Sequence, residues 1–444
     1  MTQSGSLDRR WTTIIIVLFI LGGVAFRLGW LATIGHDYWL KGGTAEAGNI
    51  ARAIAEQHSF ADSYQPGQGP TAHLSPVSPA IAGGVYLLFG YGTPLSEAVL
   101  TAWALAIIFF AFWLCYRIFE ELGSPPLARL GAFGLLAMMP LNFYTEIVNF
   151  RIWEGGITVV IAGLYLLHLL KLDRRETITT GDMWKMALLA SLCLLINPPT
   201  GLGAYAAGTI LMVRKVPRPA WIKTVLIVAV TTLAVLTPWT IRNAVVMGRA
   251  IPFRSNLPVE MALANHDGMV HDADRFKAFT DHYYVVHPAR PAGWARFKAA
   301  GGELPYFDEL ARENRAWIKA HPGDFAYLCA RHLVEFMFPP AWYWDSPGIT
   351  TSTGSTGTIV KLAINWIAST LGLLGLAYGL WRVGRGYIYI LPMLLLPILP
   401  YMIVQPIMRY RYIIFSMLVF LSFDLVGRLW ANRNAARRSI ASES

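Results

Sequence analysis

Long apolar stretches recur along most of this chain, and shorter polar connections separate them. About 20 consecutive apolar residues let a helix cross a bilayer, and a helix satisfies its backbone hydrogen bonds internally. The pattern therefore predicts an all-α polytopic membrane protein with about ten transmembrane helices. The expected spans cover roughly residues 11–26, 97–118, 126–143, 154–171, 184–198, 200–213, 221–241, 358–381, 387–405 and 412–430.

Three of these stretches have distinctive ends. The first follows Arg9 and Arg10 and begins at Trp11, as in a secretory signal peptide, but no small-residue cleavage site comes after it. We therefore expect an uncleaved first span. The fifth and sixth stretches are short, and Asn197-Pro198-Pro199 separates them, which favours a tight hairpin.

Basic residues give the orientation of the spans. If the N-terminus is cytoplasmic, every cytoplasmic connection carries lysine or arginine, as the positive-inside rule requires. Both termini are then cytoplasmic, and two long segments, residues 35–95 and 244–356, lie outside. Arg151, Arg409 and Arg411 oppose the rule because they fall on the outer side, so each needs a separate explanation.

The composition decides how the net charge is interpreted. The chain has 444 residues, of which 55% are hydrophobic and only 14% are charged, and this excludes an ordinary soluble enzyme. A formal net charge of +10 would suggest nucleic acid for a soluble protein, but here it reflects cytoplasmic loops that face anionic lipid. We expect no nucleic-acid partner. The 3 cysteines are too few and too scattered for a disulfide framework or a zinc site.

The first outer segment has helical periodicity. Ala47, Ile50, Ala51 and Ile54 fall on one face of a helix, and charged residues occupy the other faces. This arrangement predicts an amphipathic helix at the membrane surface. A second short interfacial helix is expected over residues 80–89.

The second outer segment is expected to be largely helical, with stretches over about 303–320 and 323–337. The chain accordingly divides into three parts. Residues 1–243 form an N-terminal transmembrane module that includes the first outer loop, and residues 244–356 form a periplasmic segment. Residues 357–444 form C-terminal transmembrane helices and a basic cytoplasmic tail.

Ionisable side chains at the outer ends of the spans are candidates for function, because charge is costly at membrane depth. A carboxylate can accept a proton from a sugar or lipid hydroxyl, and arginines can hold phosphate oxygens with two hydrogen bonds. This combination favours transfer from a phosphorylated lipid. The candidates are Glu46, Asp62, His73, Glu146, Arg151, Glu154, Arg242, Arg409 and Arg411.

Each candidate also has a structural interpretation. Glu46 can be a solvated charge on a surface helix, and Glu146, Arg151 and Glu154 can form an ion-pair group at the ends of two spans. The two arginines that open the last span can extend to the outer headgroups. The cluster around His266 lacks the residue spacing of a metal site, so no metal ligand is assigned.

Short motifs in the outer segments carry a resemblance. Residues 45–55 (AEAGNIARAIA), 59–60 (SF) and 69–77 (GPTAHLSPV), running into 88–90 (LFG), resemble the first periplasmic loop of bacterial family 39-like glycosyltransferases. These belong to the C-type superfamily, with protein O-mannosyltransferases and aminoarabinose transferases. Further similarity lies in residues 237–243 (TPWTIRN), in Arg254-Ser255-Asn256 with Asn265, and in the Arg409 and Arg411 pair.

The resemblance implies an integral enzyme of the bacterial inner membrane with a C-type arrangement of helices. It would move a sugar from a polyprenyl-phosphate carrier to a lipid, glycan or protein acceptor on the periplasmic side, by an inverting single displacement. Many relatives carry an aspartate general base in the first loop, where Glu46 stands here, so Glu46 is the predicted catalytic residue. A divalent cation is left open as a cofactor.

The remaining candidates are predicted to bind substrate, with the arginines near the last span on the donor phosphate and Arg242 as a weaker candidate for that role. Glu146 and Glu154 are alternatives to Glu46 as the base. The predicted substrate-binding residues are His73, Glu146, Arg151, Glu154, Arg242, Asn243, Arg409 and Arg411.

Two other classes of protein stay open. A lipid or polysaccharide transporter, or flippase, would need ionisable residues near mid-membrane in several spans, and His168 is one of few. A non-catalytic assembly subunit would bind polyprenyl lipid without reaction. Release of sugar from a labelled polyprenyl-phosphate sugar distinguishes the enzyme from both.

Overall fold

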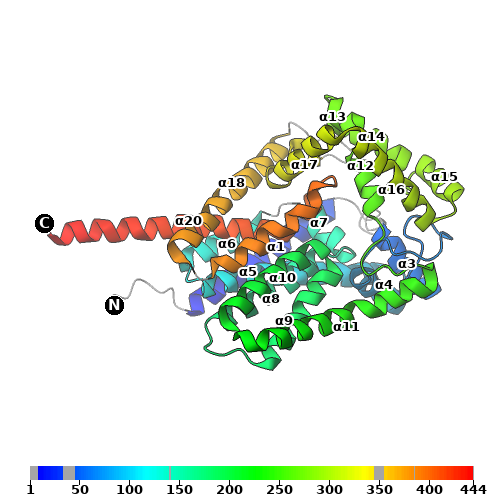
Figure 1. Cartoon of the computed structure of the whole chain (residues 1–444). Coiled ribbons are helices and arrows are strands. Elements are labelled where there is room, and N and C mark those ends of the chain that lie inside the picture. The colour runs from blue at the N-terminus through cyan, green and yellow to red at the C-terminus, as the bar shows by residue number, and fades with distance from the viewer. Residues whose placement is uncertain (1–8, 34–45, 140–141, 345–354, 385, 444) are drawn as a thin grey trace.

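The computed structural model describes residues 9–33, 46–139, 142–344, 355–384 and 386–443 of the chain (Figure 1). Helices form the regular structure in these ranges, and the β-type pairing found there is an isolated bridge between Ala61 and Pro70. The all-α prediction is confirmed.

Most of the helices form a bundle, and every expected span coincides with a helix or with two consecutive helical elements. The bundle contains α1 (Arg9–Thr33), α5 (Pro94–Glu121), α6 (Pro126–Met138), α7 (Phe143–Ile147), α8 (Gly155–Asp173), α9 (Thr180–Ile196), α10 (Pro198–Lys215), α11 (Trp221–Met247), α18 (Thr356–Tyr378), α19 (Tyr387–Leu395), η5 (Leu396–Met402) and α20 (Met408–Glu443).

Fewer helices than expected are long and apolar enough to cross a membrane. Among the described residues 6 helices meet this condition, or up to 7 if α6 and the bent segment after it count as one span. The chain is thus a multi-pass membrane protein, and by this measure fewer of its helices qualify as spans than the ten apolar stretches that were expected. The difference lies in α9, which has 17 residues, in α10, which opens with two prolines, and in α19, which prolines interrupt.

The turn between α9 and α10 is tight, as the sequence predicted. Asn197 ends α9 and caps α10, where its Oδ1 accepts a hydrogen bond from the Thr200 amide at 3.1 Å. Gly203 lets α10 approach α19, because a Cβ at this position would lie 2.8 Å from the Pro392 carbonyl oxygen. Small residues allow such close contact between membrane helices. Short helices therefore pack within the bundle.

A second group of helices lies at one end of the bundle (Figure 1). Two of them, α16 and α17, match the stretches expected over 303–320 and 323–337 to within one residue. The group contains α3 (Glu46–Gln57), α4 (Val77–Phe89), α12 (Leu257–Ala264), α13 (Asp267–His271), α14 (Arg275–Val286), α15 (Pro291–Ala300), α16 (Glu303–Ala320), α17 (Pro322–Met337) and the short η3 (Ala341–Trp344).

The apolar face predicted for the first outer helix is the buried face of α3. Ala47, Ile50 and Ala51 are fully buried, and α3 packs against α4. Gly83 on α4 permits this contact, because a Cβ there would lie 2.7 Å from the Ile54 side chain. This face therefore contacts protein, and the contact fixes the first residue of α3, Glu46, relative to the bundle.

The orientation of the chain is a prediction that thiol labelling can check. Figure 1 shows the C-terminal half of α20 projecting from the bundle at the end opposite to α12, α14 and α16. In a background without native cysteines, we expect Pro66→Cys and Lys319→Cys to react with a membrane-impermeant thiol reagent on intact cells. Arg433→Cys should react only after the membrane is permeabilised. All three positions are exposed, so protection of Pro66→Cys or Lys319→Cys would contradict the orientation.

Candidate active site

A cavity of about 550 Å³ lies where α3, α12, α14 and the start of α20 meet. Aromatic and ionisable side chains are prominent in its lining. The aromatic lining residues include Phe276, Phe279, Tyr283, Trp342 and Tyr343. The charged and imidazole side chains are Glu46, His73, Arg254, Glu260, His287, Arg290 and Arg409. A mixed lining of this kind suits a ligand with polar, charged and apolar parts.

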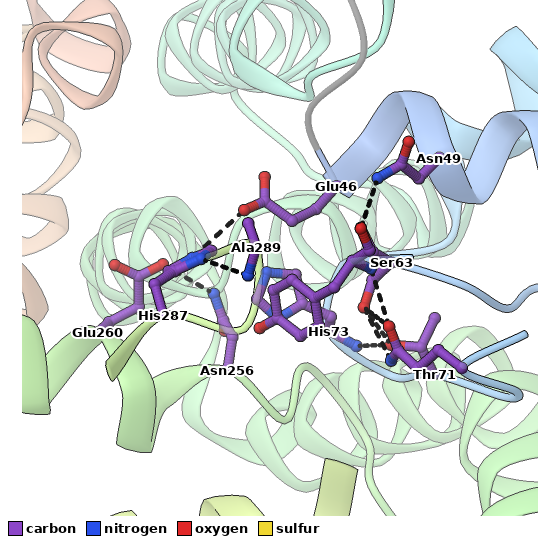
Figure 2. A network of polar contacts seen from close by, with 11 residues as sticks. Glu46, Asn49, Ser63, Thr71, His73, Asn256, Glu260, His287 and Ala289 are labelled. Carbon is purple, nitrogen blue, oxygen red and sulfur yellow. Dashed lines mark hydrogen bonds and ion pairs between the residues drawn. The ribbon is translucent and has the colours of Figure 1, made fainter. Parts of the chain in front are cut away.

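Glu46 is the first residue of α3 and faces this cavity. Figure 2 shows its carboxylate directed toward His287, and the Glu46 Oε1 and His287 Nε2 atoms are 3.3 Å apart. Burial alone would raise the pKa of Glu46, but His287, His73 and Arg409 favour its charged form more strongly than burial disfavours it, so the pKa is lowered. Glu46 is therefore ionised at neutral pH and can accept a proton.

His73 lies beside Glu46 on the loop between α3 and α4. Its Nδ1 is 2.9 Å from the Tyr64 hydroxyl oxygen, and burial lowers the pKa of His73 to about 3. At physiological pH the ring is therefore neutral and contributes a polar, uncharged side chain to the lining of the cavity. Glu303 of α16 holds the loop by hydrogen bonds. Its carboxylate accepts from the Ala72 amide at 3.0 Å and from the Ser255 hydroxyl at 2.7 Å.

Glu260 is a second carboxylate in the cavity, and it was not among the site residues predicted from the sequence. It projects from α12, and Asn256 Nδ2 donates a hydrogen bond to its Oε1 at 3.3 Å (Figure 2). Burial raises the pKa of Glu260; Arg409 opposes the shift and Glu46 adds to it. The cavity thus holds two carboxylates whose pKa values are displaced in opposite directions. One sign in the sequence was the spacing of Asn256 and Glu260 next to the Arg254-Ser255-Asn256 motif.

Arg409 supplies positive charge to the cavity from the first turn of α20. Its guanidinium carbon lies 4.0 Å from the centroid of the Trp153 ring, a cation–π contact. Its Nε is buried and finds no hydrogen-bond partner among the described residues. A buried polar group without a partner is unusual in a protein, and this N–H is free to donate. Arg409 can therefore bind an anion in the cavity.

Arg254 also lines the cavity, but a carboxylate already balances its charge. Its Nη2 lies 2.6 Å from Glu154 Oε1 and 2.8 Å from the Ile196 carbonyl oxygen. Glu154, one of the predicted substrate contacts, thus holds Arg254 and does not line the cavity itself. The Glu154 and Arg254 pair joins the start of α8 to the loop before α12.

Arg411 lies only two residues after Arg409 but points into the protein. Its Nε donates to Asn365 Oδ1 at 2.8 Å, its Nη1 donates to the Met337 carbonyl at 2.8 Å, and its Nη2 donates to the Ser369 hydroxyl at 2.6 Å. These bonds join α17 and α18 to α20. The two arginines, which were predicted to bind the donor phosphate together, therefore point in different directions.

Two more of the predicted residues form buried ion pairs away from the cavity. Glu146 Oε2 lies 2.6 Å from Arg27 Nη2, with both side chains at most 1% exposed. Arg151 forms an ion pair with Glu97 of α5. The structural interpretation expected ion pairs at these positions, but with each other; the partners come instead from α1 and α5. Both pairs connect helices of the bundle.

The remaining candidates hold the first outer loop in place. Arg242 donates hydrogen bonds from Nη1 to the Thr71 carbonyl at 2.6 Å and to Asn243 Oδ1 at 2.9 Å, and Asn243 donates to the Ile251 carbonyl at 2.8 Å. Asp62 closes a turn by accepting hydrogen bonds from the amides of two glycines. Of the predicted site residues, the cavity brings together Glu46, His73 and Arg409.

Glu146→Gln provides a test of the structural role of the buried pair. The substitution leaves the Arg27 charge without its partner, so we expect a loss of about 3–5 kcal/mol in the free energy of unfolding. Denaturant unfolding in detergent measures this loss. Glu56→Gln is the matched control, because its ion pair with Arg52 is exposed and contributes about 0–1 kcal/mol. Normal stability of Glu146→Gln with lost turnover would show instead that Glu146 acts in the reaction.

In its fold, the helical bundle resembles solved structures of C-type glycosyltransferases. The archaeal oligosaccharyltransferase AglB from Archaeoglobus fulgidus, in complex with an inhibitory peptide and a dolichol-phosphate, is similar in structure. The match has a TM-score of 0.51 and 15% identity, and it covers 99% of this chain and 52% of that protein. The apo form gives a TM-score of 0.51 and 16% identity, covering 98% and 52%.

A third solved structure also matches, ArnT from Cupriavidus metallidurans bound to undecaprenyl phosphate, with a TM-score of 0.37 and 12% identity over 95% of this chain and 79% of that one. No family model and no curated protein matches the chain. The chain spans about half the length of the archaeal enzyme. The C-type fold that the sequence resemblance implied is confirmed.

Proposed function

We propose that this protein is an integral-membrane glycosyltransferase that takes a sugar from a polyprenyl-phosphate carrier. One observation carries the proposal: an ionised carboxylate, Glu46, and a guanidinium with an unpartnered Nε, Arg409, face the same cavity. The reaction needs these two groups, one for the proton of the acceptor and one for the phosphate of the donor. The dolichol-phosphate bound to the archaeal enzyme of the same fold supports a lipid phosphate as donor.

The proposed step is a single displacement at the anomeric carbon. Glu46 takes the proton of the acceptor hydroxyl while that oxygen forms a bond to the anomeric carbon. The bond from the anomeric carbon to the phosphate oxygen breaks at the same time, and the polyprenyl phosphate leaves with the electron pair. Arg409 stabilises the charge that develops on this phosphate. Attack opposite to the leaving group inverts the configuration of the sugar.

The same proposal gives the protein a place in the cell. With the cavity at the outer ends of the spans, transfer takes place on the periplasmic side of a bacterial inner membrane, and both termini are cytoplasmic. The acceptor is a lipid, glycan or protein with a free hydroxyl. Residues 1–243 and 357–444 would then embed the site in the membrane, and residues 244–356 would cover it.

Turnover in proteoliposomes tests the proposal. The purified chain is incubated with undecaprenyl-phosphate mannose, glucose or arabinose, each radiolabelled in the sugar, together with a lipid extract of the expression host as acceptor. We expect label to leave the polyprenyl carrier with at least one donor, and undecaprenyl phosphate to appear in equal amount. The doubly substituted Glu46→Gln, Arg409→Gln protein is the control. Binding of undecaprenyl phosphate without any turnover would favour the non-catalytic subunit, and movement of intact donor across the bilayer would favour the flippase.

A further inference from the structure

The loop between α14 and α15 holds His287 in a fixed position. The Arg290 amide donates to the His287 carbonyl at 2.9 Å, and the Tyr306 hydroxyl donates to the neighbouring Val286 carbonyl at 2.6 Å. Gly293 allows α15 to lie against this backbone, because a Cβ there would stand 2.3 Å from the His287 carbonyl oxygen. The position of the imidazole is therefore set by the loop backbone.

The hydrogen bonds of the ring assign its tautomer. The Ala289 amide donates to His287 Nδ1 at 3.2 Å, so Nδ1 carries the lone pair and the proton of the neutral ring is on Nε2 (Figure 2). Nε2 is the atom that lies 3.3 Å from Glu46 Oε1. Tyr64 packs edge-on against the ring, with centroids 5.4 Å apart, and Tyr283 packs on it at 4.6 Å. The ring thus presents a donor to the carboxylate.

We propose that His287 is a positioning residue for Glu46: its Nε2–H donates a hydrogen bond to Oε1, holds the carboxylate ionised, and leaves the second oxygen for the acceptor hydroxyl. This inference rests on the proposed function of Glu46. His287 does not itself accept the proton, because the Ala289 amide occupies its lone pair. Burial also lowers the pKa of His287 to about 4, so the ring is neutral where the enzyme works.

Several other groups act on the charge of Glu46. His73 faces it from the first outer loop, Arg409 faces it from α20, and Glu260 faces it from α12 with a charge of the same sign. The hydroxyls of Tyr64 and Tyr283 also interact electrostatically with the Glu46 carboxylate. Since a hydrogen bond to the charged form of a carboxylate lowers its pKa, removal of the His287 donor should raise the pKa of Glu46 while these other groups stay in place.

An infrared pH titration tests this without any turnover. In the full-length protein in detergent, the carboxyl band that disappears in Glu46→Gln reports protonation of Glu46. We expect His287→Ala to move the midpoint of this band upward by about half a pH unit or more. His287→Gln, whose amide can reach the place of Nε2, should restore the midpoint, and His287→Asn, whose amide matches Nδ1, should not. His282→Ala removes a histidine outside the cavity lining and should leave the midpoint unchanged.

The pH profile of turnover gives the second readout. We expect His287→Ala to lower kcat about five- to tenfold, to move the acidic limb upward with the infrared midpoint, and to leave the KM for the undecaprenyl-phosphate donor unchanged. An unchanged midpoint in His287→Ala overturns the positioning role even if Glu46→Gln is inactive. If Glu46→Gln is as active as the wild type, Glu46 is not the base, and His287 then has no positioning role in catalysis. The infrared shift is independent of that result, because it reports only the contact between His287 and Glu46.

Discussion

Replacement of Glu46 by glutamine is expected to reduce the rate of sugar transfer roughly 10²–10⁴-fold, which is the usual contribution of a general base. Glutamine keeps the size of the side chain and can still accept a hydrogen bond from His287, but it cannot take the proton of the acceptor. Binding of undecaprenyl phosphate and the stability of the protein should therefore change little. The measurement is the initial rate of label transfer in proteoliposomes, together with the anomeric configuration of the wild-type product, which should be inverted.

The wild-type rate should fall when Glu46 is protonated, that is, at acidic pH. The base is active when ionised, and the pKa of Glu46 lies below the ordinary value for glutamate. The rate should therefore be constant through neutral pH and fall only in acid, by up to tenfold for each pH unit below that pKa. A limb that fell through pH 6 to 7 would indicate instead a base whose pKa is raised, as burial raises that of Glu260.

Glu56 provides the matched control on the same helix. It is exposed on α3 and pairs with Arg52 at the surface, so Glu56→Gln removes a carboxylate of α3 without altering the cavity. We expect the wild-type rate from this variant. If Glu46→Gln keeps more than about a third of the wild-type rate, the base lies elsewhere, since this loss is far below the usual contribution. Glu260 would then be the next candidate, because it shares the cavity.

Much of the fold could be predicted from the sequence because local patterns determine it. The ten apolar stretches mark the helices of the bundle, and the bounds of α16 follow from its amphipathic periodicity. The buried face of α3 also follows from periodicity. The membrane-crossing length of α9, α10 and α19 did not follow, because α9 has only 17 residues, two prolines open α10, and prolines interrupt α19 and η5.

The site was less predictable, because a cavity is formed by residues that are distant in sequence. Glu260 enters it only because α12 packs against α16 and shares the cavity with α3, and its spacing from Asn256 does not by itself separate this glutamate from an exposed one. His287 is similar, since its role depends on the tautomer that the Ala289 amide imposes. The sequence could show that a carboxylate and an arginine lie on the same side of the membrane. It could not show which of several such groups face each other.

The two arginines of α20 illustrate this limit. Successive residues of an α-helix are about 100° apart, so side chains two positions apart point to nearly opposite faces. If one of them faces the cavity, the other must face the bundle. The sequence fixes this relation but not the rotation of the helix, which depends on the contacts of Arg411 with α17 and α18. The observed rotation of α20 about its axis directs Arg409, and not Arg411, toward the cavity in which we propose that the donor phosphate binds.

Replacement of Arg409 by glutamine should therefore weaken binding of the lipid phosphate by about 1.5–3 kcal/mol, which is the usual contribution of a charged hydrogen-bond partner. This loss corresponds to an increase of about 10- to 150-fold in the Kd for undecaprenyl phosphate. Titration of the detergent-solubilised protein with undecaprenyl phosphate measures it, and intrinsic tryptophan fluorescence is a suitable signal because Arg409 stacks on Trp153.

Substitutions of two other arginines are controls. They show whether a change in Kd comes from the side chain in the cavity or from the loss of any positive charge. Arg249→Gln removes a positive charge whose ion pair with Asp308 is exposed, so it should leave the Kd unchanged. Arg411→Gln should lower the stability of the protein, because it leaves buried carbonyl groups of α17 without their donor, while the folded fraction binds with the wild-type Kd. A wild-type Kd for Arg409→Gln, or an equal loss in Arg249→Gln, would show that the cavity does not hold the donor phosphate through this side chain. The phosphate would then have to bind at Arg290, which lines the same cavity.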